Sequence, residues 1–287
     1  MAQTATASML STRILTALVL IPLVLAALFL LPPLAWGLVT LAVMLFAAAE
    51  WARLARLAPA PAILFGAGLV AAGLALLLLP RLGFDHGWPA LVVVGVCTPA
   101  ALFWAVAAPM WLRTRAAPES PLWMLPVGWL ILTAAWVALV QLQSVSPATA
   151  LAAMAAVWIA DTAAYFAGRA FGRRKLAPAI SPGKTWEGVY GALAAVVLYA
   201  LALWPTLQRT SERPDASAGA FTGWIVGAVA LVALSVIGDL FESLLKRQAG
   251  VKDSGSILPG HGGILDRIDA LLAAMPAAAL LSLAYQR

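Results

Sequence analysis

The stretch FTGWIVGAVALVALSVIGDLFESLLKRQAG, residues 221–250, decides the fold. Its first part, up to Leu240, is almost entirely apolar and is long enough to cross the roughly 30 Å of bilayer hydrocarbon as an α-helix. The polar residues that follow recur at helical spacing, so we expect the helix to continue beyond the membrane. The short alternating pattern of an outer-membrane barrel strand is not seen. The stretch therefore predicts a transmembrane helix with a polar extension.

The rest of the chain repeats this apolar pattern. The 287 residues are 63% hydrophobic and 10% charged, whereas a soluble globule normally carries about 25% charged residues. We predict an all-α, polytopic transmembrane helical bundle of about nine spans. The expected spans are 14–31, 34–50, 61–80, 88–108, 122–142, 148–167, 187–204, 221–240 and 265–285. The links at 31–33 and 143–147 predict tight hairpins, or else one broken or re-entrant segment each.

The first apolar run is predicted to be a retained span and not a signal peptide. Arg13 is its only nearby cation, and Leu31-Pro32-Pro33 follows where a cleavage site would need small residues. The only cysteine, Cys97, lies within an apolar run, so neither a disulfide framework nor a cysteine metal site is expected.

Lysine and arginine predict the orientation. Most of the 18 fall before span 1 or after spans 2, 4, 6 and 8. By the positive-inside rule these positions are cytoplasmic, with the N-terminus inside and, for nine spans, the C-terminus outside. We expect a multi-pass protein of a bacterial inner (cytoplasmic) membrane. The net charge of +6 is then explained by topology, and nucleic acid is not expected as a partner.

The chemistry is expected in the second half. Residues 1–147 have short, plain loops and should supply spans 1–5 for support and lipid access. Residues 148–287 should form the catalytic region, with spans 6–9 and two charged cytoplasmic loops at 168–186 and 241–264. No internal repeat is evident, which weakens a transporter interpretation.

The first polar constellation, residues 161–188, reads DTAAYFAGRAFGRRKLAPAISPGKTWEG. An ionised Asp161 within a span is costly unless a cation or a wet cavity lies beside it, although a polar contact between helices is an alternative. The glycines and cations that follow suit a triphosphate or a lipid phosphate, and topogenic charge explains them as well. A Walker A loop is rejected because Pro178 occupies a required glycine position and no strand is expected before it.

The end of this constellation predicts an anion site. Pro182-Gly183 is expected to form a turn that starts the next span, with Thr185 as its N-cap. The free N–H groups of that helix start, together with Ser181 and Lys184, would bind a phosphate.

The second constellation, residues 238–269, reads GDLFESLLKRQAGVKDSGSILPGHGGILDRID. Asp239, Glu242, Ser243 and Lys246 share one helix face at i, i+3, i+4 and i+7. Asp266 and Asp269 fall at i and i+3 on the first turn of the last span. Two antiparallel helices would thus bring carboxylates to one depth, which suits Mg²⁺. An ion-pair network with Lys246, Arg247 and Arg267 is the alternative.

A glycine-rich loop lies between these two helices. His261 in Pro259-Gly260-His261-Gly262-Gly263 suits either a phosphate contact or a proton transfer, or else a structural role. The glycines predict a tight turn with positive φ, a conformation that also exposes N–H groups to phosphate.

These residues resemble the signature of the phosphatidate cytidylyltransferase (CDP-diacylglycerol synthase) family. The match runs from Ser243 to Asp269, and its fixed positions are Ser243, Lys246-Arg247, Lys252-Asp253, Leu258-Pro259, His261-Gly262-Gly263, Asp266-Arg267 and Asp269. The block from Asp161 to Gly188 is also similar to the family. About the last 130 residues carry this resemblance, and residues 1–150 match in hydropathy alone.

The resemblance implies transfer of the cytidylyl group of CTP to phosphatidic acid, giving CDP-diacylglycerol and pyrophosphate for phospholipid biosynthesis. It implies Mg²⁺ held by Asp239, Asp266 and Asp269, a second cation that could be monovalent, and a homodimer. The expected catalytic residues are Asp161, Asp239, Lys246, Arg247 and Asp266. The expected substrate-binding residues are Ser181, Lys184, Thr185, Lys252, His261, Gly262, Gly263 and Arg267.

Three alternatives stay open. A CTP-dependent lipid kinase would release CDP, and a cytidylyltransferase for another lipid would release pyrophosphate from a different acceptor. An anion transporter built around Asp161 would carry solute without nucleotide turnover. It would also need charge near the midplane, whereas most of the charge here falls at the cytoplasmic boundary.

Overall fold

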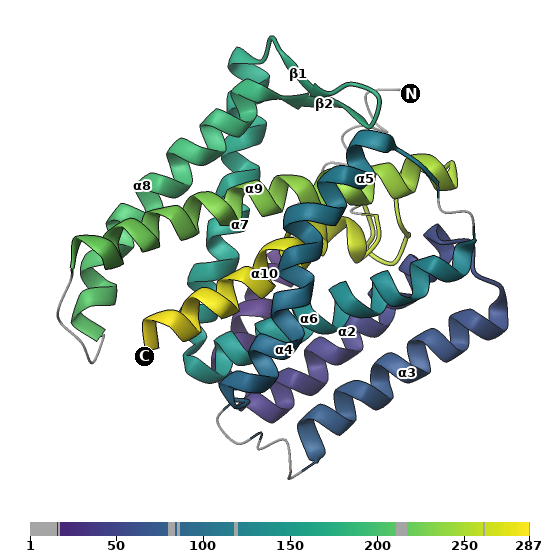
Figure 1. Ribbon diagram of the computed structural model, residues 1–287, viewed down its shortest axis with the longest axis horizontal. Coiled ribbons are helices and arrows are strands. Elements are labelled where there is room, and N and C mark those ends of the chain that lie inside the picture. Colours follow the sequence, from purple (N-terminus) through teal and green to yellow (C-terminus); the bar gives the residue numbers. More distant parts are fainter. Residues whose placement is uncertain are drawn as a thin grey trace.

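A computed structural model describes residues 16, 18–79, 84, 87–117, 120–210, 217–260 and 262–286. Eight of its helical segments are long and apolar enough to cross a membrane (Figure 1). The main elements are α2 (Pro33–Leu54), α3 (Pro59–Leu78), α4 (Ala90–Leu102), α5 (Ala108–Thr114), α6 (Met124–Val145), α7 (Pro147–Phe171), β1 (Lys175–Ala177), β2 (Ser181–Thr185), α8 (Trp186–Thr210), α9 (Ala218–Ala249) and α10 (Leu265–Gln286). The predicted helical transmembrane bundle is confirmed.

The eight segments correspond to the last eight predicted spans. The first predicted span, 14–31, is an apolar helix from Leu18 to Leu30, shorter than the other eight, and part of its start lies outside the described residues. The fourth span is continuous from Ala90 to Thr114, because a π-helical turn at Phe103–Ala107 joins α4 to α5. A widened turn fits a helix that must continue into Pro109, whose ring cannot donate a backbone hydrogen bond.

Local sequence explains where the helices begin and end. Pro33, Pro59 and Pro147 occupy first helical positions, where the missing N–H costs nothing. Ser146 alone separates α6 from α7, and its hydroxyl accepts from the N–H groups of Ala148 and Thr149. The 143–147 link therefore joins two separate helices.

α9 ends in a left-handed cap at Gly250, where φ is 75°. The Gly250 N–H donates to the Arg247 carbonyl, and the next N–H, of Val251, donates to the Lys246 carbonyl. This is the Schellman arrangement, and glycine suits it because a side chain would be strained at that φ. The cap stops α9 just after its polar residues and turns the chain back toward α10.

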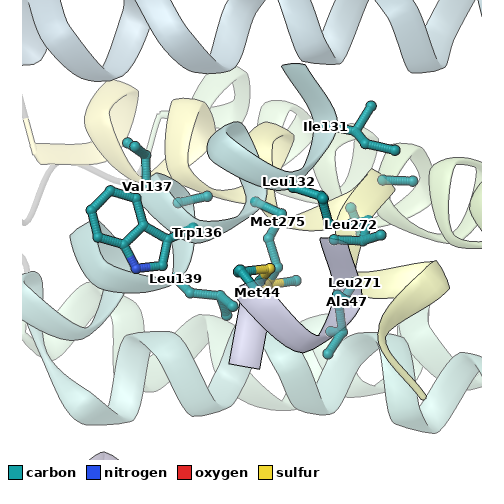
Figure 2. Close-up of a cluster of buried hydrophobic side chains, with 14 of the residues drawn as sticks. Met44, Ala47, Ile131, Leu132, Trp136, Val137, Leu139, Leu271, Leu272 and Met275 are labelled. Carbon is teal, nitrogen blue, oxygen red and sulfur yellow. The ribbon is translucent and has the colours of Figure 1, made fainter. Parts of the chain in front are cut away.

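The most enclosed helices are α2, α6 and α10, half or more of whose apolar windows are buried. Figure 2 shows side chains of these helices meeting in one cluster that includes Met44, Ala47, Trp136, Leu271 and Met275. Indole N–H groups bind α2 to α6, because Trp51 donates to the Met124 carbonyl and Trp136 to the Gly37 carbonyl, each at 2.9 Å. α10 lies in the middle of the bundle and packs against α2, α4, α6, α7 and α9.

α8 begins at Trp186, close to the predicted start of the seventh span, but the turn predicted at Pro182-Gly183 is wrong. Both residues belong to β2, which pairs with β1 as an antiparallel hairpin, and the turn lies at 178–180. The expectation that no strand precedes Gly183-Lys184-Thr185 is wrong as well. The hairpin forms because its turn residue Ile180 is buried against Leu240 and Leu244 of α9, and the Arg247 Nε donates to the Ile180 carbonyl.

Both predicted cytoplasmic loops contain regular structure, which was expected for the start of the second loop but not for the first. In the first, 168–186, residues up to Phe171 complete α7 and the hairpin follows. In the second, 241–264, residues up to Ala249 continue α9, so the irregular part begins at Gly250. The polar face predicted for residues 239–246 is thus helical throughout.

Candidate active site

α7, β2, α9 and α10 bring charged side chains together at one end of the bundle. Lys184 on β2 forms an ion pair with Asp239 on α9, with 2.5 Å between Nζ and Oδ2. Asp161 on α7 lies in the neighbourhood of both side chains. The hairpin therefore joins the two constellations that the sequence shows as separate blocks.

Lys246 makes the second link, between α9 and α10. Its Nζ lies 2.6 Å from Glu242 Oε2 and 2.6 Å from Asp266 Oδ1. The Lys246 side chain is only 15% exposed. Removing one partner of such an enclosed ion pair is costly, because the other charge is then buried without a partner.

Gly238 brings α9 and α10 close together beside these residues. A methyl group added at Gly238 would lie 2.5 Å from the Asp269 carbonyl oxygen and 2.8 Å from the Ala273 side chain. Gly238 directly precedes Asp239, so this contact brings Asp269 of α10 beside the polar part of α9. The close helix contact thus places Asp269 next to the α9 carboxylates, as the sequence predicts.

Acidic groups outnumber cations in this cluster. Five carboxylates, of Asp161, Asp239, Glu242, Asp266 and Asp269, meet the ammonium groups of Lys184 and Lys246. Neither oxygen of buried Glu242 has a hydrogen bond of good geometry within the described residues. Glu242 Oε2 lies 2.6 Å from Lys246 Nζ and forms an ion pair with this ammonium group, so Oε1 is the atom left without a partner among the described residues.

The two Asp266 oxygens have different partners. Oδ1 contacts Lys246, while Oδ2 accepts from the N–H groups of Gly263 and Ser254 at 2.8 and 2.9 Å and lies 3.0 Å from the Ser254 hydroxyl oxygen. Oδ2 is therefore committed to the loop between α9 and α10, and Oδ1 faces the charged cluster.

Comparison with known proteins covers nearly the whole chain. The sequence pattern of the "Cytidylyltransferase family" matches residues 11–284. The chain belongs to the cytidylyltransferase family. A phosphatidate cytidylyltransferase of Pseudomonas aeruginosa is 42% identical over 281 residues, which are 95% of this chain and 97% of that protein.

Two other bacterial relatives carry the same name. The phosphatidate cytidylyltransferase of Haemophilus influenzae is 53% identical over 120 residues, 42% of this chain and 40% of that protein. That of Brucella suis is 38% identical over 218 residues, 75% of this chain and 63% of that protein. The similarity thus extends well beyond the last 130 residues, and the first half of this cytidylyltransferase also belongs to the shared sequence.

The remaining predicted residues of this cytidylyltransferase lie around the cluster. Arg247 is held by the hairpin through its Nε, and the side chains of Lys252 and Arg267 are exposed. Gly262 has a φ of 82° and Gly260 one of 72°, so the predicted tight turn is confirmed. Gly263 has no positive φ, and its N–H is directed inward to Asp266. His261 lies outside the described residues.

Thr185 caps α8 as predicted, because its hydroxyl accepts from the Gly188 N–H at 3.2 Å. The Thr185 side chain is buried. A methyl group added at Gly168 or at Gly172 would lie 3.0 Å from Thr185 Oγ1. These glycines therefore serve close packing of α7 against the hairpin end. Ser181, at the start of β2, is half-buried and pairs with Ala177 across the hairpin.

Glu187 closes the hairpin, a role that the sequence analysis missed. Its carboxylate accepts from the N–H groups of Arg173 and Arg174 at 3.0 and 3.1 Å, and the Arg174 guanidinium lies 3.4 Å away. Hydrogen bonds raise the pKa of Arg174 above its ordinary value, mainly the one to the Tyr190 hydroxyl and next the one to Glu187. The sequence feature that could have predicted this role is an acidic residue in the first turn of a helix, where a carboxylate is stabilised.

Glu50 and Ser254 also belong to this region, and neither was predicted from the sequence. Glu50 lies in α2, is fully buried, and contacts the loop that leads into α10. Ser254, 5% exposed, lies between Glu50 and Asp266. An acid at the end of an apolar run was the available signal for Glu50, but its partner could not be read from spacing.

A cavity of about 800 Å³ lies in the other half of the bundle and contains none of the predicted site residues. It is lined by α6–α10 around Ala152, Tyr199, Trp224 and Tyr285. The polar atoms of these three aromatic side chains already donate to backbone carbonyls. The cavity thus offers mainly apolar surface, and the charged cluster at the other end is the candidate active site.

Proposed function

We propose that this chain transfers the cytidylyl group of CTP to phosphatidic acid, giving CDP-diacylglycerol and pyrophosphate. The observation that carries the proposal is its similarity, over nearly its full length, to an enzyme named for this substrate. A membrane bundle with a charged cluster at one end suits a reaction between a soluble nucleotide and a lipid headgroup. The enzyme acts in phospholipid biosynthesis.

The reaction is an in-line displacement. A phosphate oxygen of phosphatidic acid attacks the α-phosphorus of CTP, and the bond from that phosphorus to the oxygen bridging to the β-phosphate breaks. Pyrophosphate leaves with the electron pair. A phosphate monoester is already mostly ionised at pH 7, so positioning and charge neutralisation, rather than a strong base, supply the rate.

The charged cluster fits a divalent cation. It holds more carboxylates than lysines, and Glu242 Oε1 has no partner among the described residues. Its acids are spread along the helices, and within the described ranges no three of them form a ready-made cage. Mg²⁺ suits such a set because it takes one or two carboxylates and completes its shell with waters and substrate phosphates.

Asp239, Asp266 and Asp269 would hold this cation, with Asp266 using its Oδ1 atom. A second, monovalent cation is proposed from the family resemblance alone. When bound, the cation supplies neutralisation of charge on the reacting phosphates. Lys184 and Lys246, released from their carboxylates, bind the phosphate oxygens, and Arg247, Lys252 and Arg267 add positive charge at the rim.

The site is proposed to face the cytoplasm of a bacterial cell. The ends of α2, α5 and α9 that carry arginine or lysine meet there, because Arg56 Nη2 donates to the Gln248 carbonyl and Gln248 Nε2 to the Arg115 carbonyl. The hairpin that follows α7 joins them through Arg247 Nε, which donates to the Ile180 carbonyl. The positive-inside rule places this end in the cytoplasm. Acyl chains would enter between helices from the inner leaflet. The homodimer stays a prediction from the family.

Pyrophosphate release tests the proposal. Purified protein in detergent–lipid micelles receives CTP, phosphatidic acid and Mg²⁺, with each left out in turn. We expect release that requires all three, together with a cytidine-bearing lipid. Release of CDP instead would identify a kinase, and release only with another lipid would change the acceptor. No turnover by folded protein with any lipid would contradict the enzyme assignment.

A further inference from the structure

Glu50 is a buried acid in the first half of the chain, where the sequence predicts no catalytic residue. Its side chain has no exposed surface, and it lies on α2 among apolar neighbours. Arg53 Nη2 is 3.9 Å from Glu50 Oε1, at the outer limit of an ion pair, and the Arg53 side chain is 60% exposed. Hydrogen-bond donors must therefore stabilise the carboxylate.

Those donors come from the other half of the chain. Ile264 N–H donates to Oε1 at 3.0 Å, and Leu265 N–H donates to Oε2 at 2.8 Å. α10 begins at Leu265, and the preceding Ile264 has no side-chain acceptor to cap it. Glu50 supplies the missing acceptor from α2, where the helix dipole also favours a carboxylate.

Two glycines allow this approach. A methyl group at Gly255 would lie 2.2 Å from Glu50 Oε1, and one at Gly263 would lie 2.4 Å from Glu50 Oε2. Contacts that short do not occur between real atoms, so any side chain at either position would displace the loop or the carboxylate. The loop is shaped around Glu50.

Ser254 extends the contact to the charged cluster. Its hydroxyl oxygen is 2.7 Å from Glu50 Oε2 and 3.0 Å from Asp266 Oδ2. The same oxygen accepts from the Asp266 N–H at 3.3 Å, and the Ser254 N–H donates to Asp266 Oδ2. A continuous set of contacts thus leads from Glu50 through Ser254 and Asp266 to Lys246.

We propose that Glu50 is a positioning residue for the cytidylyl transfer. By holding Ser254 and the start of α10, it keeps Asp266 Oδ2 bound to the loop and Oδ1 directed at the charged cluster. α2 then takes part in building the catalytic centre, beyond supporting it. The inference rests on the proposed function, because it gives Asp266 a role in the reaction.

The test compares Glu50→Gln with Glu50→Asp and Thr40→Val. Glutamine keeps the size but replaces one acceptor oxygen with an NH₂ group, which must face an N–H or O–H donor. Aspartate keeps both acceptors on a shorter stem. Thr40 is a matched control, since it is a buried polar residue of α2 whose hydroxyl donates within the helix to Trp36 and Gly37 carbonyls.

Two measurements are made on each full-length variant. Hydrogen–deuterium exchange over residues 250–268 reports the loop, and pyrophosphate release reports kcat and the Mg²⁺ concentration for half-maximal rate. For Glu50→Gln we expect this segment to exchange about tenfold faster or more. We expect kcat to fall by about tenfold or more, and a tenfold change is equivalent to about 1.4 kcal/mol. The half-maximal Mg²⁺ concentration should rise. Glu50→Asp should recover part of both effects, and Thr40→Val should match the natural protein.

Each other outcome contradicts the inference. Faster exchange with unchanged kcat and Mg²⁺ response would reduce Glu50 to a structural role, and lower kcat with unchanged exchange would remove the link through the loop. If Glu50→Gln does not fold, Ser254→Ala breaks the same link and must show the same two changes. If the natural protein releases no pyrophosphate, the proposed function fails, while the exchange measurement still decides whether Glu50 holds the loop.

Discussion

Two of the three aspartates predicted to hold the cation, Asp266 and Asp239, have different surroundings. Asp266 accepts hydrogen bonds from Gly263 and Ser254 and pairs with Lys246, so its position is fixed before any substrate arrives. Asp239 pairs with Lys184 and accepts a 3.4 Å hydrogen bond from the Ser243 hydroxyl. It is 34% exposed and more easily rearranged than Asp266, which is 6% exposed.

This contrast predicts different costs for the same substitution. Asp239→Asn and Asp266→Asn should each lower pyrophosphate release by about 100-fold, because each removes a charge from the reacting centre. Asp266→Asn should also lower the melting temperature, because it leaves Lys246 with Glu242 alone in a buried setting. Turnover assays and thermal melts of both variants check this. More than about a tenth of the natural rate in either variant would contradict its role.

At the residue scale, spacing along a helix was enough to predict which side chains share a face. Asp239, Glu242, Ser243 and Lys246 lie as the i, i+3, i+4 and i+7 pattern indicates. Contacts between distant segments were not predictable in this way. Nothing in the sequence joins Glu50 to Ser254, because the contact depends on how α2 packs in three dimensions.

At the element scale, the hairpin β1–β2 delivers Lys184 to α9. Ile180 at its turn is 5% exposed and packs on Leu240 and Leu244. Ile180→Ala should loosen the hairpin by about 2 kcal/mol or more through lost apolar contact. We expect easier proteolysis between α7 and α8 and a higher KM for CTP. Pro182→Ala is the control, because Pro182 is exposed in the same hairpin. If the two variants showed the same proteolysis and the same KM for CTP, the packing of the hairpin on α9 would not be needed for the site.

The contact between α9 and α10 gives a second prediction at this scale. Gly238→Ala places a methyl group against the Asp269 carbonyl and Ala273, which should cost about 1–3 kcal/mol and shift Asp239 relative to Asp269. Gly95→Ala is matched to it, since Gly95 lies within α4 and an added methyl group would meet nothing within 4 Å. Thermal melts and turnover assays should show loss for Gly238→Ala only.

Long helices were predicted well because apolar length is a strong signal. The hairpin was missed because its strands have three and five residues, and Pro182-Gly183 favours a turn when considered alone. Packing of Ile180 on α9 overrides that local preference. The helical extension of α9 was predicted correctly, because its polar residues keep helical spacing beyond the apolar run, and the helix ends at Ala249.

At the scale of the whole molecule, orientation is the property to test. Cys97 is buried, and Cys97→Ser provides a background for single exposed cysteines. Ala117 and Ser217 are both exposed, after the fourth span and before the eighth. In intact spheroplasts, a membrane-impermeant thiol reagent should label the Ser217→Cys variant and reach the Ala117→Cys variant only after permeabilisation. Reversed labelling would place the charged cluster outside the cytoplasm.

The central place of α10 has a consequence for the order of events during synthesis. α10 follows α2–α9 in the chain, yet it fills the middle of the bundle and carries Asp266 and Asp269. A ribosome makes the surrounding helices first, and domains generally fold from the N-terminal side as they emerge. The earlier helices therefore cannot complete their packing until α10 inserts. A chain whose translation stops before Leu265 would enter the membrane without two of its three predicted cation ligands, so no partly made molecule could consume CTP.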